Sequence, residues 1–206
     1  MSRTSLISKR LFDLSLVFLT LPIWFGVLVI IAVVVRVKLG SPIFFTQQRV
    51  GQHQKLFNLF KFRSMTSEHG SDGKLLADNI RLRPFGRWLR ASSLDELPEL
   101  LLVIRGHLSL IGPRPLPVMY LTRYSAHQTR RHEVLPGLSG WAQVNGRNLQ
   151  SWDNRFEFDV WYVDNRSLWL DAKIVLLTFR SVLTRHGVSA VGHDTMPEFN
   201  PPPSTH

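Results

Sequence analysis

Near its N-terminus the chain carries a long apolar run, from Leu14 to Val35, without a single charged residue. At a rise of ~1.5 Å per residue, a helix over this run is about 33 Å long, enough to cross the hydrocarbon core of a bilayer. Core helices of soluble proteins rarely stay apolar on every face for so long. A cleavable signal peptide would end in small residues, whereas Ile30 to Val35 is mostly β-branched. The pattern therefore favours a membrane segment.

Two details set this run apart from an ordinary span. Pro22 lies within it, where a proline removes a backbone amide and kinks the helix. The positive-inside rule needs an imbalance of basic residues, but they flank both ends: Arg3, Lys9 and Arg10 before the run, and Arg36, Lys38 and Arg49 after it. Two arrangements stay open, a broken helix that enters and leaves by the same face and a kinked single span. We expect a membrane element in residues 1–40 and a separate domain in 41–206.

Shorter elements follow. Ser41–Thr46 and Lys55–Phe62 are predicted to be extended, with a turn at Val50–Gln52 between them. Leu82–Leu89 has helical spacing, and Pro84 fits there if it lies in the first turn.

A capping box is predicted where Ser93 precedes Glu96 by three residues. The helix that it starts should tolerate Pro98 near its first turn and end at Gly106. Its buried stripe would be formed by Leu97, Leu100, Leu101 and Ile104.

In the C-terminal half, strands and helices are predicted in alternation. His107–Ile111 and Trp141–Val144 read as strands, and residues 116–134 as helical. Leu168–Leu183 is an amphipathic helix that either packs in a core or lies on a membrane surface. The proline-rich tail from Pro197 is expected to be mobile. Together these elements predict an α+β fold that is mostly α.

Composition narrows the function. Hydrophobic residues make up 44% of the 206 residues and charged residues 19%, which excludes an intrinsically disordered chain. The absence of cysteine excludes disulfides and thiolate chemistry. A net charge of +10 calls for a polyanionic partner, which could be nucleic acid, an anionic membrane surface or a phosphorylated substrate. The histidines form no HxxxH pair, and P-loop, GxGxxG and GxSxG motifs are absent.

An acidic pair, Asp95 and Glu96, follows directly after an arginine-rich stretch that contains Arg81, Arg83, Arg87 and Arg90. Acidic residues are ordinary in the first turn of a helix, because they complement its dipole. The same surroundings would also favour a permanently charged carboxylate, suited to act as a nucleophile or a Mg²⁺ ligand. The residues alone leave both interpretations open.

Two basic residues, Arg114 and Lys61, can likewise be interpreted in more than one way. Arg114 stands between prolines that fix its backbone, so it is either an oriented phosphate clamp or a surface arginine. Lys61 lies between Phe60 and Phe62 in a predicted strand, where the simplest expectation is a solvent-facing side chain. The acidic residues Asp159, Asp164 and Asp171 show no metal-ligand spacing.

Ordered motifs along nearly the whole chain resemble those of one family, the small monotopic polyprenol-phosphate phosphoglycosyl transferases, or bacterial sugar transferases. The matching blocks are Lys9-Arg10-Leu11-Phe12-Asp13, PIFFTQQRVG (42–51), FKFRSM (60–65), LRASSLDELPELLLVIRGHLSLIGPRPL (89–116), LPGLSGWAQVNGR (135–147) and GHDTMPEFN (192–200). The succession of DELP, GPRP and GWAQVNGR in this order is highly specific.

The resemblance implies transfer of a sugar-1-phosphate from a UDP-sugar to polyprenol (undecaprenyl) phosphate, with release of UMP. It places the enzyme at the cytoplasmic face of the bacterial inner membrane, where it would start glycan assembly and pass its product to downstream glycosyltransferases. The implied fold is a re-entrant membrane helix followed by a small cytosolic catalytic domain with short strands and interfacial amphipathic helices. Nucleic acid is not an expected partner. The sequence leaves a homodimer open and does not identify the sugar.

The resemblance also assigns roles by position. It implies that Asp95 is the nucleophile and that Glu96 helps to bind Mg²⁺ as the cofactor. The positions that handle the substrate would be Lys61, Arg90, Arg114, Pro115, Arg147 and Asp171. The family's re-entrant helix breaks at a Ser-Pro pair. Here Pro22 follows Leu21, with Thr20 one step earlier, which makes the location of the break a departure from the family.

Two rival functions use the same residues differently. A membrane-tethered binding module would hold nucleic acid or anionic lipid on its arginines. A membrane phosphohydrolase would replace the lipid phosphate with water. Their products differ from those of a transferase, so product analysis separates the three.

Overall fold

The computed structural model describes three stretches of the chain: 3–146, 151–184 and 198–199. The chain forms two compact units, which are residues 1–47 with 59–105 (unit 1) and residues 48–58 with 106–206 (unit 2). Its described part is mostly helical with two small sheets, as the sequence predicts. The membrane boundary expected at residue 40 stays a prediction.

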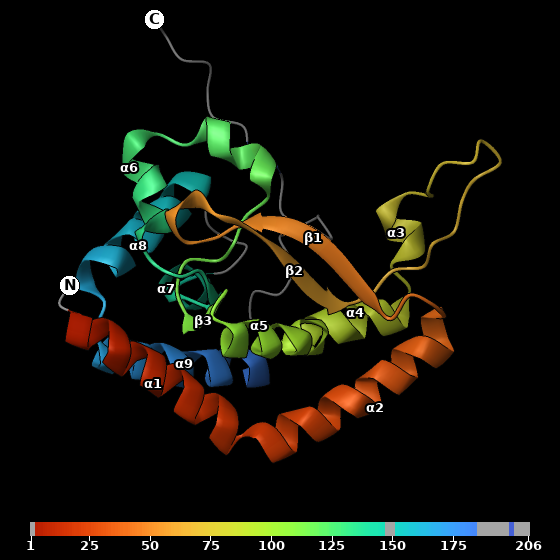
Figure 1. The fold of residues 1–206 in the computed structure, drawn as a ribbon. Helices are drawn as coiled ribbons and strands as arrows, with labels where there is room; N and C mark the ends of the chain where they lie inside the picture. Colours follow the sequence, from red (N-terminus) through yellow and green to blue (C-terminus); the bar gives the residue numbers. More distant parts are fainter. Residues whose placement is uncertain (1–2, 147–150, 185–197, 200–206) are drawn as a thin grey trace, which may run out of the picture. The chain divides into compact units, whose positions relative to one another are not determined.

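In unit 1 the apolar run forms two helices rather than one. Helix α1 spans Arg3–Leu19 and α2 spans Leu21–Leu39, and they are the two arms of a V (Figure 1). The helices meet at Thr20, and Pro22 lies in the first turn of α2, where its missing amide breaks no helical hydrogen bond. The Thr20 hydroxyl donates instead to Leu16 O at 2.7 Å. A helix break therefore lies next to Pro22, within the apolar run.

Among the described helices, α2 alone is long and apolar enough to cross a membrane by length and composition, with a mean hydropathy of 2.2. Most of its apolar surface is not packed against the protein. Large exposed side chains run along both arms of the V: Leu11, Phe18, Leu19, Ile23, Phe25, Ile30, Val33 and Val37. Such a surface needs a cover other than water. The re-entrant arrangement itself stays a prediction.

The other helices of unit 1 are α3 (Asp78–Arg81), α4 (Pro84–Ala91), η2 (Leu94–Glu99) and α5 (Leu100–Arg105). Helices α4 and α5 lie across the open side of the V, and α3 lies apart from it (Figure 1). Pro84 begins α4, in the first-turn position that the sequence requires. Helix α1 contacts α5, and α2 contacts η2. The core between them is formed by Ile31, Val35, Phe62 and Leu89.

The predicted capping box is wrong. Ser93 has a left-handed backbone (φ 57°), and its side chain makes no capping hydrogen bond. The segment that follows is the 3-10 helix η2, and α-helical geometry starts only at Leu100. Pro98 explains this, because it has no amide to donate to the carbonyl of Leu94 in an α-helix. The acidic pair thus lies in a short, tight turn before α5 and not in the first turn of a long helix.

The two predicted extended segments form a hairpin. Strands β1 (Phe44–Val50) and β2 (Leu56–Phe62) make a two-stranded sheet. The short 3-10 turn η1 (Gln52–Gln54) joins them, and Gly51 N donates to Lys55 O at 2.8 Å. The predicted turn is confirmed, while β1 extends further than expected.

Unit 2 is built on a short parallel sheet of β3 (Ser109–Ile111) and β4 (Gly137–Ser139). The strand predicted at Trp141–Val144 is wrong, since these residues form helix α7. Trp141 stacks on Trp161 at a centroid distance of 5.0 Å, so its alternating pattern reflects helix packing and not a strand.

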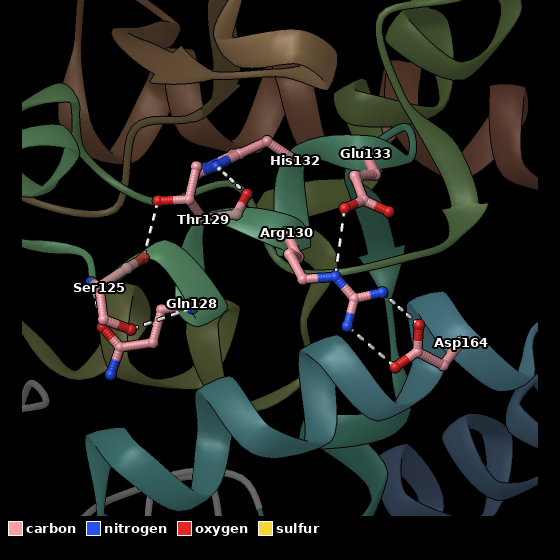
Figure 2. Close-up of polar contacts among 7 residues, drawn as sticks. All are labelled: Ser125, Gln128, Thr129, Arg130, His132, Glu133 and Asp164. Atoms are coloured by element: carbon pink, nitrogen blue, oxygen red, sulfur yellow. Dashed lines mark hydrogen bonds and ion pairs between the residues drawn. The ribbon is translucent and has the colours of Figure 1, made fainter.

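The other helices of unit 2 are mostly short. They are η3 (Val118–Arg123), α6 (Ala126–Thr129), η4 (Arg130–Glu133), α8 (Trp152–Asn165) and α9 (Leu168–Thr184). Thus 116–134 is helical, as predicted, but in three pieces. Figure 2 shows how α6 and η4 are fixed, since Ser125 caps α6 and Arg130 pairs with Glu133 and Asp164.

Helix α9 carries apolar residues on two faces. Ile174 is buried in the core of unit 2, while Trp169 is 82% exposed and Leu176 and Phe179 are also exposed. The helix therefore packs in a core and also offers an apolar face outward. Contact of that face with a membrane surface stays a prediction.

Candidate active site

Asp95 is buried on η2, with only 3% of its surface exposed. Lys61 of β2 reaches it, with Nζ 3.7 Å from Asp95 Oδ2. The expectation that Lys61 faces solvent is therefore wrong. Successive strand residues point to opposite faces, so with Phe62 fully buried in the core of unit 1, Lys61 is directed to the other side of the strand. A positive charge thus lies beside a buried carboxylate.

Arg90 is brought to the end of β2 by a close helix approach. Its Nε donates to Ser64 Oγ at 2.9 Å. Helix α4 comes near enough because residue 86 is glycine, where a Cβ would lie 1.8 Å from Ser64 O. Neighbouring arginines are used to shape the chain, since Arg81 Nε donates to Thr66 O at 2.8 Å and Arg83 pairs with Glu68. The arginine-rich stretch is therefore partly a scaffold.

Glu96 is half-buried next to Asp95, and Glu99, on the same turn, is buried. Sequence reasoning did not single out Glu99. Within the described residues, no group of three or more His, Cys, Asp or Glu side chains is placed to hold a metal ion. Mg²⁺ commonly binds through one or two carboxylates plus substrate phosphates. Binding of Mg²⁺ by Glu96 together with a substrate stays a prediction.

Arg10 of α1 is hydrogen-bonded to the backbone of α5, the helix that follows η2. Its Nη1 donates to Val103 O at 2.6 Å and its Nη2 to Ile104 O at 2.9 Å. These carbonyls belong to the last turn of α5, where helix carbonyls lack helical partners. Asp13, which is buried, pairs with Lys9 at 2.8 Å. The Lys9–Asp13 motif of the sequence is thus a structural anchor of the V.

In unit 2, Arg114 lies on a loop fixed by close glycine contacts. A Cβ on Gly137 would lie 2.0 Å from Gly112 N, and one on Gly140 would lie 2.2 Å from Gly112 O. Gly112 N donates to Ser139 O at 2.9 Å, and Gly137 N donates to Pro113 O at 3.0 Å. Only residues without a side chain allow these backbones to meet, which explains the LPGLSG and GPRP motifs together.

The buried Arg131–Asp159 ion pair is also bonded to the Arg114 loop. Arg131 is bound to Asp159 Oδ2 by Nη2 at 2.7 Å and by Nε at 3.1 Å. Its Nη2 also donates to Arg114 O at 2.7 Å. Burial, the largest single influence, would lower the pKa of Arg131, but the charges of Asp159 and Tyr124 and its hydrogen bonds to them together hold that pKa above its usual value. Arg114 is half-buried and Pro115 is buried.

Asp171 is only 2% exposed and accepts a hydrogen bond from the Tyr162 hydroxyl at 2.7 Å. In this structure it contacts the core of unit 2, and a role in substrate binding stays a prediction. Arg147 lies outside the described residues. The structure thus brings Lys61 to Asp95 in unit 1, with Glu96 beside them, and places Arg114, Pro115 and Asp171 in unit 2.

Comparison with known protein families identifies the family of this chain. The sequence model of the family described as "Bacterial sugar transferase" matches residues 4–185. The chain belongs to the bacterial sugar transferase family. Its resemblance to polyprenol-phosphate phosphoglycosyl transferases and its assignment as a transferase enzyme are confirmed at this level.

Several individual bacterial sugar transferases are similar over most of the chain. An "Uncharacterized sugar transferase EpsL" of Bacillus subtilis (strain 168) is 52% identical over 194 residues, which are 94% of this chain and 96% of the relative. The "UDP-glucose:undecaprenyl-phosphate glucose-1-phosphate transferase" of Xanthomonas campestris pv. campestris is 39% identical and covers 86% of this chain. The "UDP-N-acetylgalactosamine-undecaprenyl-phosphate N-acetylgalactosaminephosphotransferase" of Aeromonas hydrophila is 35% identical and covers 87%.

The match covers the relatives unequally. The chain spans nearly all of EpsL but only 39% of the Xanthomonas relative and 44% of the Aeromonas relative. On this chain, the residues that the family model matches, 4–185, include the Asp95–Glu96 pair and the Arg114 loop.

Proposed function

We propose that this bacterial sugar transferase transfers a sugar-1-phosphate from a UDP-sugar to polyprenol phosphate and releases UMP. Relatives whose names specify glucose or N-acetylgalactosamine also specify undecaprenyl phosphate as the acceptor. The observation that carries the proposal is the buried Asp95 carboxylate beside Lys61, in the same unit as the membrane-length helix α2.

In the first step, an Asp95 carboxylate oxygen attacks the sugar-bearing phosphorus of the donor. The bond between this phosphorus and the bridging oxygen breaks, and the electron pair leaves with UMP. The product is an acyl phosphate, in which the sugar phosphate is joined to the Asp95 carboxylate. Lys61, whose Nζ lies 3.7 Å from Asp95, offers a fixed positive charge where negative charge builds up on the phosphoryl oxygens.

Asp95 is favoured over Glu96 as the nucleophile on geometric grounds. Successive residues of a helical turn project about 100° to 120° apart, so both carboxylates cannot face one phosphorus atom in line. Lys61 pairs with Asp95, and the shorter Asp side chain has fewer rotamers to fix before attack. Glu96 is left to hold Mg²⁺. Such a cation, when bound, neutralises charge on the donor's phosphates.

In the second step, an oxygen of the polyprenol phosphate attacks the phosphorus of the acyl phosphate. The bond to Asp95 breaks, the carboxylate is regenerated, and polyprenyl-diphospho-sugar is formed. Arg90, which the structure fixes on Ser64, supplies a cation suited to phosphate binding in unit 1. A lipid acceptor requires access from a membrane, which the exposed apolar arms of the V would provide.

The membrane arrangement is part of the proposal. We infer that the V enters and leaves by the cytoplasmic face, because basic residues flank both of its ends. Single cysteines at Ser5 and Ser41 of this Cys-free chain can be labelled in intact cells with an impermeant thiol reagent. Both should be protected until the cells are permeabilised. Labelling of one site alone in intact cells would instead indicate a kinked single span.

Product analysis tests the reaction. The protein is incubated with a panel of UDP-sugars, with and without polyprenol phosphate. A transferase yields UMP and polyprenyl-diphospho-sugar in equal amounts. Free sugar phosphate in place of the lipid product would indicate a phosphohydrolase, and the absence of turnover with any donor would indicate a binding module.

A further inference from the structure

A residue of the C-terminal tail, Phe199, is packed inside unit 2. The tail from Pro197 is expected from its sequence to be mobile, yet Phe199 is only 3% exposed. Its ring lies among four aromatic rings, at centroid distances of 4.9 Å from Phe156, 5.6 Å from Tyr120 and Trp152, and 6.0 Å from Tyr124. The expectation of mobility is therefore wrong for this part of the tail.

The backbone beside this ring is also bound. Phe199 N donates to the Tyr120 hydroxyl oxygen at 3.1 Å. Arg123 Nη1 donates to Phe199 O at 2.6 Å and pairs with Glu198 Oε1 at 2.7 Å. Apolar burial alone would allow many orientations, but these bonds fix the direction of the chain. Residues 198–199 are thus docked in one defined way.

Each of the four rings that contact Phe199 also lies against an arginine, and two of these contacts bear on Arg114 and its neighbours. Arg155 lies over the Trp152 ring at 5.2 Å, and Arg131 lies over the Phe156 ring at 5.6 Å. Arg131 in turn donates to the backbone oxygen of Arg114. A chain of direct contacts therefore runs from Phe199 to Arg155 and, through Arg131, to Arg114. We call Arg114, Arg131 and Arg155 the arginine cluster.

The arginine cluster brings positive charges together in a largely buried place. Arg131 and Arg155 are both buried. Burial lowers the pKa of Arg155 to about 10, the Asp159 carboxylate opposes this, and the charges of Arg114 and Arg131 add to it. Asp159 is already bound twice by Arg131. Grouped, partly desolvated cations of this kind gain most from an anion with several oxygens, such as a phosphate or diphosphate.

We propose that Phe199 is a positioning residue for the arginine cluster, and that Arg155 joins Arg114 there in binding the diphosphate of the nucleotide donor. The docked ring fixes the Trp152 and Phe156 faces on which two of the arginines rest. This inference depends on the proposed function for the identity of the anion. It adds two residues, Arg155 and Phe199, to which neither the motifs nor the relatives assign a role.

The test uses the full-length protein in detergent or nanodiscs, with UDP as the probe because every UDP-sugar contains it. Phe199→Ala should weaken UDP binding by about tenfold and raise the donor KM to match, with kcat at saturating donor within about twofold of wild type. Arg155→Met should weaken UDP binding similarly. Glu157→Gln is the control, since this exposed glutamate of α8 lies outside the dock, and it should behave as wild type.

A second variant keeps the test decisive if Phe199→Ala fails to fold. Arg123→Gln removes the bond to Phe199 O at the partly exposed edge of the dock, and it should also weaken UDP binding. Wild-type UDP affinity in both Phe199→Ala and Arg123→Gln would overturn the inference, and so would a fall in kcat with an unchanged KM. If the wild-type protein itself binds no UDP, the proposed function fails rather than the role of Phe199.

Discussion

Two buried aspartates, Asp95 in unit 1 and Asp159 in unit 2, show how one residue type serves two purposes. They are 3% and 2% exposed. Asp159 is in the middle of the regular helix α8, and a planar guanidinium grips it with two bonds of 2.7 and 3.1 Å. Asp95 is in a short 3-10 turn between a left-handed serine and a proline, with a lysine ammonium at 3.7 Å.

The difference teaches what a reactive carboxylate requires. A bidentate arginine pair uses the carboxylate oxygens and locks the side chain, which suits a structural ion pair. A lysine is a point charge on a flexible stem and can turn toward an incoming phosphate. The tight turn positions Asp95 without a regular helix around it. Burial alone therefore does not separate the two aspartates, and we propose from their partner cations that Asp159 serves the fold and Asp95 the reaction.

The largest expected effect is on the chemistry of unit 1. Asp95→Asn should abolish UMP release, by at least about a thousandfold, because an amide cannot act as the nucleophile. Circular dichroism should show that the variant is still folded, so that the loss of activity is assigned to the chemistry. Steady-state assays with a UDP-sugar and polyprenol phosphate measure the activity. Residual turnover within tenfold of wild type would remove the distinction between the two aspartates.

The converse change affects stability. Asp159→Asn should destabilise the fold by about 3–5 kcal/mol, because it leaves the buried Arg131 without its counter-charge. The folded fraction should still release one UMP per enzyme at saturating donor, with a higher donor KM through displacement of Arg114. Denaturant unfolding and burst kinetics measure the two effects. Loss of the burst with an unchanged free energy of unfolding would contradict the structural role of Asp159.

A smaller effect is expected at Glu96. Glu96→Gln should raise the Mg²⁺ concentration needed for half-maximal activity by about tenfold or more, because a neutral amide is a weaker ligand for a hard cation than a carboxylate. Activity measured across a Mg²⁺ titration gives this shift, with Glu133→Gln, on an exposed turn of unit 2, as the control. Full wild-type activity in the presence of a chelator would contradict the role of Glu96.

The smallest effect concerns His132, next to Arg131 in the sequence. Burial, and then the charge of Arg131, lower its pKa from 6.5 to about 4. Figure 2 shows its Nδ1 directed to Thr129 O, at 3.1 Å. The unfolded chain takes up this proton near pH 6.5 and the folded chain only near pH 4. His132 therefore costs stability, on the order of 1–3 kcal/mol, as the pH falls through this window.

Unfolding of wild type and His132→Gln at pH 7 and pH 4.5 measures that effect. The variant should lose less stability between the two pH values than wild type does. Equal losses would show that His132 does not report on the surroundings of the Arg131–Asp159 pair.

Local patterns in the sequence predicted much of unit 1. The apolar run, the hairpin and the first-turn position of Pro84 follow from spacing and turn chemistry. The capping box failed because the S-x-x-E spacing cannot show that Ser93 adopts a left-handed conformation or that Pro98 enforces a 3-10 turn. Lys61 was misread for a related reason: alternation gives the face of a strand, but only tertiary packing decides what covers that face.

The contacts of unit 2 were harder to predict from the sequence. The Arg131–Asp159 pair joins residues far apart in the chain, with no spacing rule to connect them. The Trp141–Val144 pattern fitted a strand because four residues are too few to separate a period of 2 from one of 3.6. Phe199 was hidden by its proline-rich surroundings, since composition predicts mobility but not that a single ring finds an aromatic site.

The central claim, that Asp95 is a covalent nucleophile, is tested most directly by intact-protein mass spectrometry. The enzyme is incubated with its UDP-sugar and Mg²⁺ without lipid acceptor. The account predicts a burst of UMP that approaches one per enzyme, a mass increase equal to one sugar-phosphate located on Asp95, and its loss when polyprenol phosphate is added. An enzyme that shows no adduct, and releases no UMP until the lipid is present, would contradict it.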